Sequence, residues 1–279
     1  MADLFATVSD ADLSQVSEPQ PVDPLLRRLA FISVLTPEQM RTVAAMQGPP
    51  QKLAPRSQLG RAGDPATSAY VIHEGWAFAY TLLANGERQV HGFLLPGNIV
   101  RLDDLFRDRA GRGVETITDT VVSEISMGSL RRVSRQWPEI FELLLRLQSQ
   151  VQSALVEQLV NLGRRDSHAR VAHLLLRLER RLMRIGRAGS DGYYCPISQY
   201  LIADALGLTA IHVNRVLRAL REEGVVTLRK DHVTIHDRAR LMAIAGEDGI
   251  DAGGANVVPM DHGIHSGSHT GNGRSRASL

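Results

Sequence analysis

The residues with the clearest chemical meaning lie in the segment TAIHVNRVLR, residues 209–218. If this segment is helical, a turn of about 100° per residue places five residues on or beside one polar face: Ile211, His212, Asn214, Arg215 and Arg218. The guanidinium of Arg215 can make two hydrogen bonds to guanine O6 and N7. Asn214 can pair with adenine in the same way, and Ile211 can pack on a thymine methyl group. The segment therefore has the chemistry of a surface that reads base edges.

Two short helices joined by a glycine turn must position that surface. Ser198 is a suitable N-cap for a first helix, and Gly207 can adopt the left-handed conformation that ends it. Thr209 is then the N-cap of the second helix. Four residues of the second helix recur at the spacing of a buried stripe: Val213, Val216, Leu217 and Leu220. This pattern predicts a helix-turn-helix, whose second helix enters the major groove of DNA.

Two β-type runs, GVVTLRK and HVTIHD, follow the second helix and predict a wing that brings Arg229 and Lys230 near phosphates. Residues 164–240 contain 15 lysines and arginines against 8 aspartates and glutamates, a local net charge of +7 in a chain of net charge +2. Such concentrated positive charge favours a polyanionic partner. The predicted contacts with double-stranded DNA are Ser198, Gln199, Thr209, Ala210, Ile211, His212, Asn214, Arg215, Arg218, Arg229 and Lys230.

The middle of the chain has the pattern of a small antiparallel barrel. From about residue 50, short apolar runs alternate with Gly, Asn and Pro. Asn85 and Gly86 lie between two such runs and predict a hairpin with a type I′ turn, in which both central residues have positive φ. Gly75 and the pair Pro96–Gly97 mark further turns. The predicted fold class is α+β, with an N-terminal β-barrel or jelly roll.

Residues 138–164 contain few turn residues and predict a long amphipathic helix. Its apolar stripe consists of Leu144, Leu147, Val151, Leu155, Leu159 and Leu162. The stripe has two interpretations: it packs against the chain's own barrel, or it forms a seam with a twin helix. The helix is too long to be covered by a barrel of about 80 residues. We therefore expect a homodimer that forms through this stripe.

The two ends of the chain lack the pattern of a folded element. Residues 1–22 are polar and acidic, and the C-terminal residues are rich in Gly, Asp, Ser and His. The tail histidines His262, His265 and His269 lack fixed-spacing acidic or cysteine ligands, which favours a solvated tail over a metal site. The predicted organisation is a flexible arm (1–22), a sensor barrel (23–136), a dimerisation helix (137–165), a winged helix-turn-helix (166–245) and a disordered tail (246–279).

No signal sequence or membrane-length apolar stretch is found in the sequence, so we expect a cytoplasmic protein with no membrane partner. Enzyme motifs are also missing: there is no glycine-rich phosphate loop, no zinc-type His-Glu-x-x-His run and no Gly-x-Ser-x-Gly elbow. We expect no catalytic activity. A different class of function remains open at this point, namely a small-molecule receptor whose winged helix contacts proteins.

The order of barrel, long helix and winged helix-turn-helix resembles the CRP/FNR superfamily of bacterial transcription regulators. The resemblance covers about residues 24–245 and rests on LLPGNIVRLDDLF, on the helix of 138–164 and on IADALGLTAIHVNRVLRAL. In the last of these, the spacing Gly-x-x-x-x-x-Val-x-Arg runs from Gly207 to Arg215. The resemblance implies a homodimer that presents two recognition helices to a palindromic operator, with RNA polymerase as a further partner.

Several family features are missing, and each absence argues against a cofactor. Where relatives that bind cyclic AMP carry a Gly-Glu pair, an Arg-Ser pair and a Thr-Ser pair, this chain has Arg101–Leu102, Arg112–Gly113 and Leu155–Val156. Iron–sulfur sensors of the family need several cysteines, and this chain has one. Haem sensors need axial ligands in the barrel, and a barrel histidine such as His73 or His91 is more often a packing residue. We therefore expect no cofactor.

Two further positions stand out. At the position of Ile211 most relatives carry a glutamate that contacts cytosine, so the resemblance implies a DNA half-site different from the family's usual one. Cys195 precedes the first helix of the helix-turn-helix. It has two interpretations: a redox switch whose oxidation weakens DNA binding, or an inert thiol in the buried strand segment GYYC.

Overall fold

A computed structural model describes residues 23–247 of the chain. The predicted arm of residues 1–22 lies outside the described residues, as do the tail beyond residue 247 and its histidines His262, His265 and His269. Within the described range, no helix is both long enough and apolar enough to cross a membrane.

Two short helices precede the sheets, and their own sequences set where each begins. Helix α1 spans Pro24–Ala30, and the Asp23 carboxylate accepts a hydrogen bond from Leu25 N at 2.7 Å. Helix α2 spans Pro37–Ala45 and begins with a capping box, in which Thr36 and Gln39 each bond the other's backbone N–H. Both helices carry proline in the first turn, where its missing N–H is not needed.

Two four-stranded antiparallel sheets pack face to face as a jelly roll. One sheet has the order β1-β8-β3-β6 and the other β2-β7-β4-β5. Their strands are β1 (Gln51–Leu53), β2 (Gln58–Gly60), β3 (Ser68–Glu74), β4 (Ala77–Leu82), β5 (Arg88–Leu94), β6 (Ile99–Val100), β7 (Gly113–Thr116) and β8 (Thr120–Ser126). Ile72 and Val122 form a cross-strand pair of one sheet and pack with Ala79 and Val114 of the other. The barrel is therefore a sandwich of two sheets with an apolar interior.

The β4–β5 hairpin forms as expected, but its turn is not type I′. Gly86 has a φ of 84°, whereas Asn85 is not among the residues with positive φ. Gly86 N donates to Leu83 O at 2.9 Å and Leu83 N donates to Glu87 O at 2.8 Å. This is a longer loop with one left-handed glycine, which a twisted hairpin accepts as readily as the two-residue turn.

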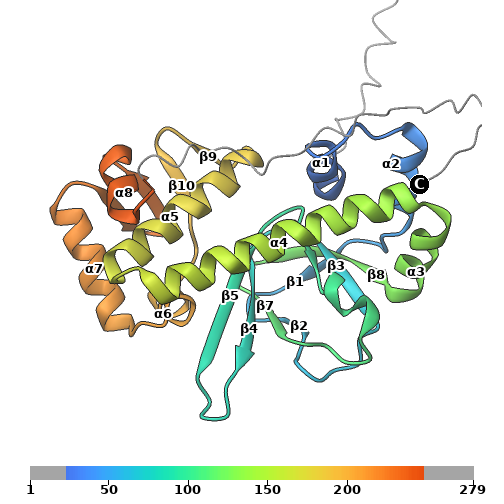
Figure 1. Ribbon diagram of the computed structural model, residues 1–279, viewed down its shortest axis with the longest axis horizontal. Helices are drawn as coiled ribbons and strands as arrows, with labels where there is room; N and C mark the ends of the chain where they lie inside the picture. The colour runs from blue at the N-terminus through green and yellow to red at the C-terminus, as the bar shows by residue number, and fades with distance from the viewer. Residues whose placement is uncertain (1–22, 248–279) are drawn as a thin grey trace, which may run out of the picture.

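Three helices lead from the sandwich to the C-terminal domain: α3 (Met127–Gln136), α4 (Pro138–Arg164) and α5 (Ser167–Arg184). Helix α4 crosses the whole molecule, as Figure 1 shows, with the sandwich beneath it and the C-terminal helices at its far end. Its N-terminal half contributes Ile140, Leu143, Leu144 and Leu147 to a core shared with α1, α2 and α3. That half of the helix belongs to the sandwich domain.

The C-terminal domain consists of three further helices and a small sheet. The helices are α6 (Gln199–Leu206), α7 (Ala210–Glu222) and α8 (Arg238–Ala245), and the strands are β9 (Ala188–Gly189), β10 (Gly192–Tyr194), β11 (Val226–Arg229) and β12 (His232–Ile235). The strand order is β11-β12-β10-β9. Helix α8 was not expected from the sequence. Glu247 is buried and paired with Arg180, so the folded domain extends two residues past the predicted boundary at residue 245.

One hydrophobic core joins the two domains. Trp76, Phe78, Val90 and Phe93 of the sandwich pack in the same cluster as the buried residues of α5, α6 and α7. The contact places strand β5 directly against helix α6. The sandwich therefore holds the helix-turn-helix in a defined orientation.

Candidate nucleic-acid interface

The two helices of the helix-turn-helix begin and end at the residues that the sequence predicts. Ser198 Oγ accepts a hydrogen bond from Leu201 N at 3.3 Å, and Thr209 Oγ1 accepts one from His212 N at 3.2 Å. Between the helices, Gly207 has a φ of 62°, a left-handed conformation that a side chain would strain. These local features place α6 and α7 one after the other across a tight turn.

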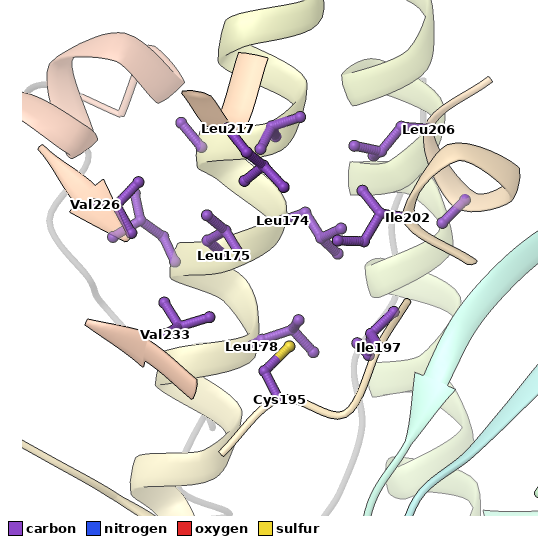
Figure 2. Close-up of a cluster of buried hydrophobic side chains, with 14 of the residues drawn as sticks. Leu174, Leu175, Leu178, Cys195, Ile197, Ile202, Leu206, Leu217, Val226 and Val233 are labelled. Carbon is purple, nitrogen blue, oxygen red and sulfur yellow. The ribbon is translucent and has the colours of Figure 1, made fainter. Parts of the chain in front are cut away.

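Helix α7 buries one face and exposes the other. Its four predicted core residues, Val213, Val216, Leu217 and Leu220, are all buried. They pack against Leu174, Leu175, Ile202 and Leu206, part of the cluster that Figure 2 draws between α5, α6 and the wing strands. The angle at which α7 leaves the domain is set by this packing.

The outward face of α7 carries the predicted reading residues. Ile211 is 76% exposed, an unusual position for a large apolar side chain. Asn214, Arg215 and Arg218 are also exposed, whereas His212 is half-buried. The structure therefore brings Ile211, Asn214, Arg215 and Arg218 to one surface.

Two of these side chains already have partners. Asn214 Nδ2 donates to Gln199 Oε1 at 3.1 Å, so α6 orients the amide that α7 presents. Arg218 Nε lies 2.7 Å from Glu222 Oε1, one turn along the helix. Among the residues described, Arg215 makes no ion pair and no side-chain hydrogen bond, so its five N–H donors face solvent. Of Asn214, Arg215 and Arg218, Arg215 is therefore the best placed to form a new bidentate contact with a base.

The other predicted contacts lie around this face. Ser198 and Thr209 are exposed, and Gln199 and Ala210 are half-buried, at the first turns of α6 and α7. Gln199, Asn214, Arg218 and Arg221 line a solvent-open hollow of about 90 Å³ between α6, α7 and β11. Arg221 and the 74%-exposed Tyr200 were not predicted from the sequence. The buried stripe of Ile202, Ala205 and Leu206 leaves Tyr200 on the outward face of α6, and this spacing could have identified it from the sequence.

The wing is a hairpin with a tight turn. Strands β11 and β12 pair from Val226↔Ile235 to Arg229↔His232, which leaves Lys230 and Asp231 as the two turn residues. Their φ values are 48° and 57°, the type I′ pattern that the sequence placed at Asn85–Gly86 instead. Arg229 and Lys230 are exposed at the tip. The two-residue turn fixes the register of the wing and so the position of its basic tip.

The exposed apolar stripe of α4 differs from the predicted one. Leu144 and Leu147 are buried in the chain's own core, so these two residues are not available to a twin helix. Val151 and Leu162 are half-buried. The exposed apolar side chains are Leu145, Leu155, Val156, Leu159 and Val160. The exposed apolar residues differ from the predicted ones because leucines in the first half of α4 pack against the sandwich domain.

Cys195 lies in the interior of the C-terminal domain. It is 1% exposed, and Figure 2 shows its sulfur beside Leu178. Burial raises the pKa of its thiol to about 12, with Asp231 adding to the rise. A protonated, enclosed thiol is a poor nucleophile, so this position favours the inert-thiol interpretation over the redox switch.

Several polar contacts between the domains were missed by sequence reasoning. Arg88 of β5 makes two hydrogen bonds to Asp204 of α6, at 3.0 and 2.8 Å. Gln89 and Gln158 both donate to Ala205 O, at 3.3 and 2.7 Å. These contacts join residues about 50 to 120 positions apart, and no local pattern marks them. They hold the end of α6, next to the turn that leads into α7.

In the sandwich, the side chain of Arg101 is held by groups of the protein itself. Its guanidinium pairs with Asp104 at 3.1 Å and donates to Leu59 O and Pro65 O, at 3.4 and 3.3 Å. Both Arg101 and Asp104 are buried. The buried carboxylate of Asp104 would repel a phosphate group, and Leu102 supplies no polar contact. All three guanidinium nitrogens of Arg101 are therefore engaged by groups of the sandwich itself.

The two barrel histidines have ordinary surroundings. His73 Nε2 lies 2.9 Å from Ser123 Oγ. Burial, together with Arg112, lowers the pKa of His91. Across residues 23–247, there is no group of three or more His, Cys, Asp or Glu residues spaced to hold a metal ion.

Together, the buried scaffold, the exposed arginine-bearing helix and the basic wing define the winged helix-turn-helix class of DNA-binding proteins. Comparison with known proteins agrees with this geometry. Residues 50–136 match the family model for the cyclic nucleotide-binding domain, and residues 169–244 match that for the Crp-like helix-turn-helix domain.

Individual relatives cover most of the chain. The nitrogen fixation regulation protein FixK of Bradyrhizobium diazoefficiens is 30% identical over 182 residues, which cover 65% of this chain and 76% of that protein. The anaerobic regulatory protein of Pasteurella multocida is 26% identical over 209 residues, 75% of each chain. The solved structure of FixK2 from Bradyrhizobium japonicum superposes with a TM-score of 0.65 at 26% identity and covers 70% of this chain and 96% of that one.

The chain therefore belongs to the CRP/FNR family of transcription regulators. It is a DNA-binding regulator and not an enzyme. The sequence-based expectations of the family, the fold class and the DNA-binding function are confirmed.

Proposed function

We propose that the chain regulates transcription as a homodimer that binds a palindromic operator through α7, without cyclic AMP, in the cytoplasm and in contact with RNA polymerase. The observation that carries the proposal is the outward face of α7, where Arg215 is exposed and unpaired among the described residues while Asn214 is oriented by Gln199. A helix held this firmly from behind can present its side chains to a groove at a constant angle.

The dimer is supported by the apolar face of α4. Leu155, Val156, Leu159 and Val160 are all at least 40% exposed along two turns of one helix. A second copy of the same helix, related by twofold symmetry, would cover them and would place two α7 helices at two half-sites. Binding to a palindrome then follows from the symmetry of the protein.

The bases that α7 reads follow from its side chains. Arg215 pairs with a guanine, and Asn214 with an adenine beside it. Ile211 has no hydrogen-bonding group, so it selects a thymine methyl instead of the cytosine that a glutamate would contact. The operator core therefore differs from that of relatives with glutamate at this position.

Independence from cyclic AMP is supported by the Arg101–Asp104 pair inside the sandwich. The three residue pairs expected to hold the nucleotide are Arg101–Leu102, Arg112–Gly113 and Leu155–Val156, and Arg112 is engaged by Asp103 at 2.5 Å. An iron–sulfur cluster lacks thiolate ligands, since the single cysteine is buried in the other domain. Haem is not part of the proposal, because His73 and His91 have the surroundings of packing residues.

The test is selection of bound duplexes from random DNA with purified full-length protein. We expect an enriched palindrome with two half-sites about one helical turn apart and affinity that falls steeply as salt rises. Addition of cyclic AMP should leave the affinity unchanged, and the protein should show no visible absorption band. A selection without an enriched palindrome would contradict the proposal and favour a winged helix that contacts proteins.

Substitutions can distinguish a residue that recognises a base from one that contributes to affinity for any duplex. Arg215→Ala should weaken binding to the selected site by about 1–3 kcal/mol and relax the preference at one base pair. Arg218→Ala, on the same face but engaged with Glu222, is the matched control and should weaken all duplexes equally. If Arg215→Ala kept wild-type affinity and preference, the assignment of guanine to Arg215 would be wrong.

A further inference from the structure

A hollow lies beside the reading face of α7, on the side where α6 and the first wing strand, β11, approach this helix. It opens to solvent, and its volume of about 90 Å³ has room for several water molecules. Four of its wall residues belong to α7, one to α6 and one to β11: Asn214, Leu217, Arg218, Arg221, Gln199 and Leu228. None of the six is acidic, and two arginines and two amides form the polar part of the wall. This composition suits an anion.

Both arginines of the wall have N–H donors to spare. Arg221 is exposed, and its side chain makes no hydrogen bond or ion pair with any residue from 23 to 247. Arg218 uses its Nε for Glu222 Oε1, at 2.7 Å, and its two terminal nitrogens have no partner within the same range. A step of three residues keeps Arg218 and Arg221 on one side of the helix. Two guanidinium groups can therefore bind the oxygens of one anion.

Gln199 connects this hollow to the base-reading residue Asn214. Its Oε1 accepts a hydrogen bond from Asn214 Nδ2 at 3.1 Å, and its Nε2 has no partner in the described part of the chain. Asn214 keeps one N–H and its Oδ1, which are the donor and the acceptor that pair with N7 and N6 of adenine. The Gln199 amide thus has its oxygen on Asn214 and its N–H groups available to an anion in the hollow.

We propose that the hollow binds one phosphate of the DNA backbone and that Gln199 links this phosphate to base recognition by Asn214. Both roles rest on the proposed function, in which α7 enters the major groove. A helix in that groove has a sugar–phosphate backbone along each side of its reading face. The hollow lies at the edge of this face, since Asn214 belongs to both. Arg221 and the terminal nitrogens of Arg218 bind the phosphate oxygens, and Gln199 Nε2 donates to one of them.

The phosphate fixes the orientation of two amides in turn. A side-chain amide can present either its oxygen or its NH₂ group to a neighbour. Once Gln199 Nε2 is bound to phosphate, Oε1 faces Asn214 and requires a donor there. Asn214 then keeps Nδ2 towards Gln199 and Oδ1 towards the base. Gln199 is therefore a positioning residue that acts on the base through Asn214.

The phosphate contact is tested by the salt dependence of binding to a labelled duplex of random sequence, measured with full-length protein by fluorescence anisotropy. Loss of one phosphate contact lowers the slope of log K against log salt by about one. Arg221→Gln should show this change and should bind about tenfold more weakly at low salt. Arg135→Gln removes the same charge from an exposed position on α3 and should keep the wild-type slope. Equal slopes for the two variants would overturn the phosphate contact.

The link through Gln199 is tested by selection of duplexes with the variant proteins. Gln199→Ala should relax the same base pair as Asn214→Ala, and the double variant should relax it no further than Asn214→Ala alone. Gln199→Glu can still accept from Asn214 but repels phosphate, so it should keep the base preference and bind every duplex about tenfold more weakly. An unchanged preference in Gln199→Ala, with the preference lost in Asn214→Ala, would overturn the link.

The two tests also separate this proposal from the proposed function. A wild-type selection without an enriched site would contradict the proposed function and the link together. The salt slopes need no operator, so they would still decide whether Arg221 binds a phosphate. An enriched palindrome combined with an unchanged slope for Arg221→Gln would instead leave the proposed function standing and remove the phosphate from the hollow.

Discussion

The two halves of helix α4 carry similar leucines at similar spacing but have different surroundings. In the first half, Leu144 and Leu147 are buried in a core shared with α1, α2 and α3. In the second half, Leu159 is 70% exposed and Val156 is 57% exposed. The same amphipathic pattern thus serves the chain's own fold at one end and faces solvent at the other.

The difference shows what a helical stripe can and cannot predict. The stripe identifies the helix and its apolar face, but the partner of that face depends on which other elements reach it. The sandwich and the two N-terminal helices cover the first half of α4. Beyond Leu147 the described chain leaves Leu155, Val156, Leu159 and Val160 exposed, whereas Gln158 and Asn161 are buried on the other side by α5 and α6.

The largest expected effect is that of Leu144→Ala. Because Leu144 is fully buried, the substitution leaves a cavity and should lower the free energy of unfolding by about 2–5 kcal/mol. The loss should be the same at every protein concentration, measured by urea denaturation. A loss that grows on dilution would place Leu144 in the dimer contact after all.

Low pH should lower the free energy of unfolding through His173, which lies on α5 near its junction with α4. Burial, with Arg165 next in importance, lowers the pKa of His173 from 6.5 to about 4 in the folded protein. The unfolded chain binds the proton first, so stability should fall as the pH drops from about 6.5 to about 4 and the loss should level off below that. The total is about 3 kcal/mol at most. His173→Gln should reduce this slope in urea titrations, whereas the exposed His168→Gln should keep it.

Leu159→Ala should affect association and leave the fold intact. A twofold dimer loses two side chains, so dimerisation should weaken by about 2 kcal/mol, roughly thirtyfold, in analytical ultracentrifugation. Leu82→Ala is the matched control, because Leu82 is 62% exposed on β4, away from α4. Equal dimer constants for both variants would show that the exposed half of α4 is not the interface.

The smallest effect is expected for Gln158→Ala, on the face of α4 opposite to the exposed stripe. Gln158 is buried and donates to Ala205 O, which Gln89 also reaches, so the carbonyl keeps one partner. The free energy of unfolding should fall by about 1 kcal/mol. Ser153→Ala, at an exposed position of the same half, should change nothing. If Gln158→Ala changed the dimer dissociation constant, the buried face in the second half of α4 would also contribute to the dimer contact.

Much of the DNA-binding domain could be predicted from the sequence, because its signals are local. Ser198, Gly207 and Thr209 act on residues within four positions of themselves, and the buried stripe of α7 repeats every three or four residues. The type I′ turn shows the limit of such signals. Asn85–Gly86 has the preferred residues, but the five-residue loop 83–87 forms instead, while Lys230 and Asp231 adopt positive φ because the wing strands pair up to Arg229↔His232.

The sequence by itself determined the order of the elements, the reading face of α7 and the family to which the chain belongs, since these depend on residue types and short spacings. The tertiary structure decided which half of α4 is covered, that Cys195 is enclosed, and that Arg88 meets Asp204 across 116 positions. Burial and long-range pairing depend on which surfaces pack together, and the spacing of residues along the chain does not specify those surfaces.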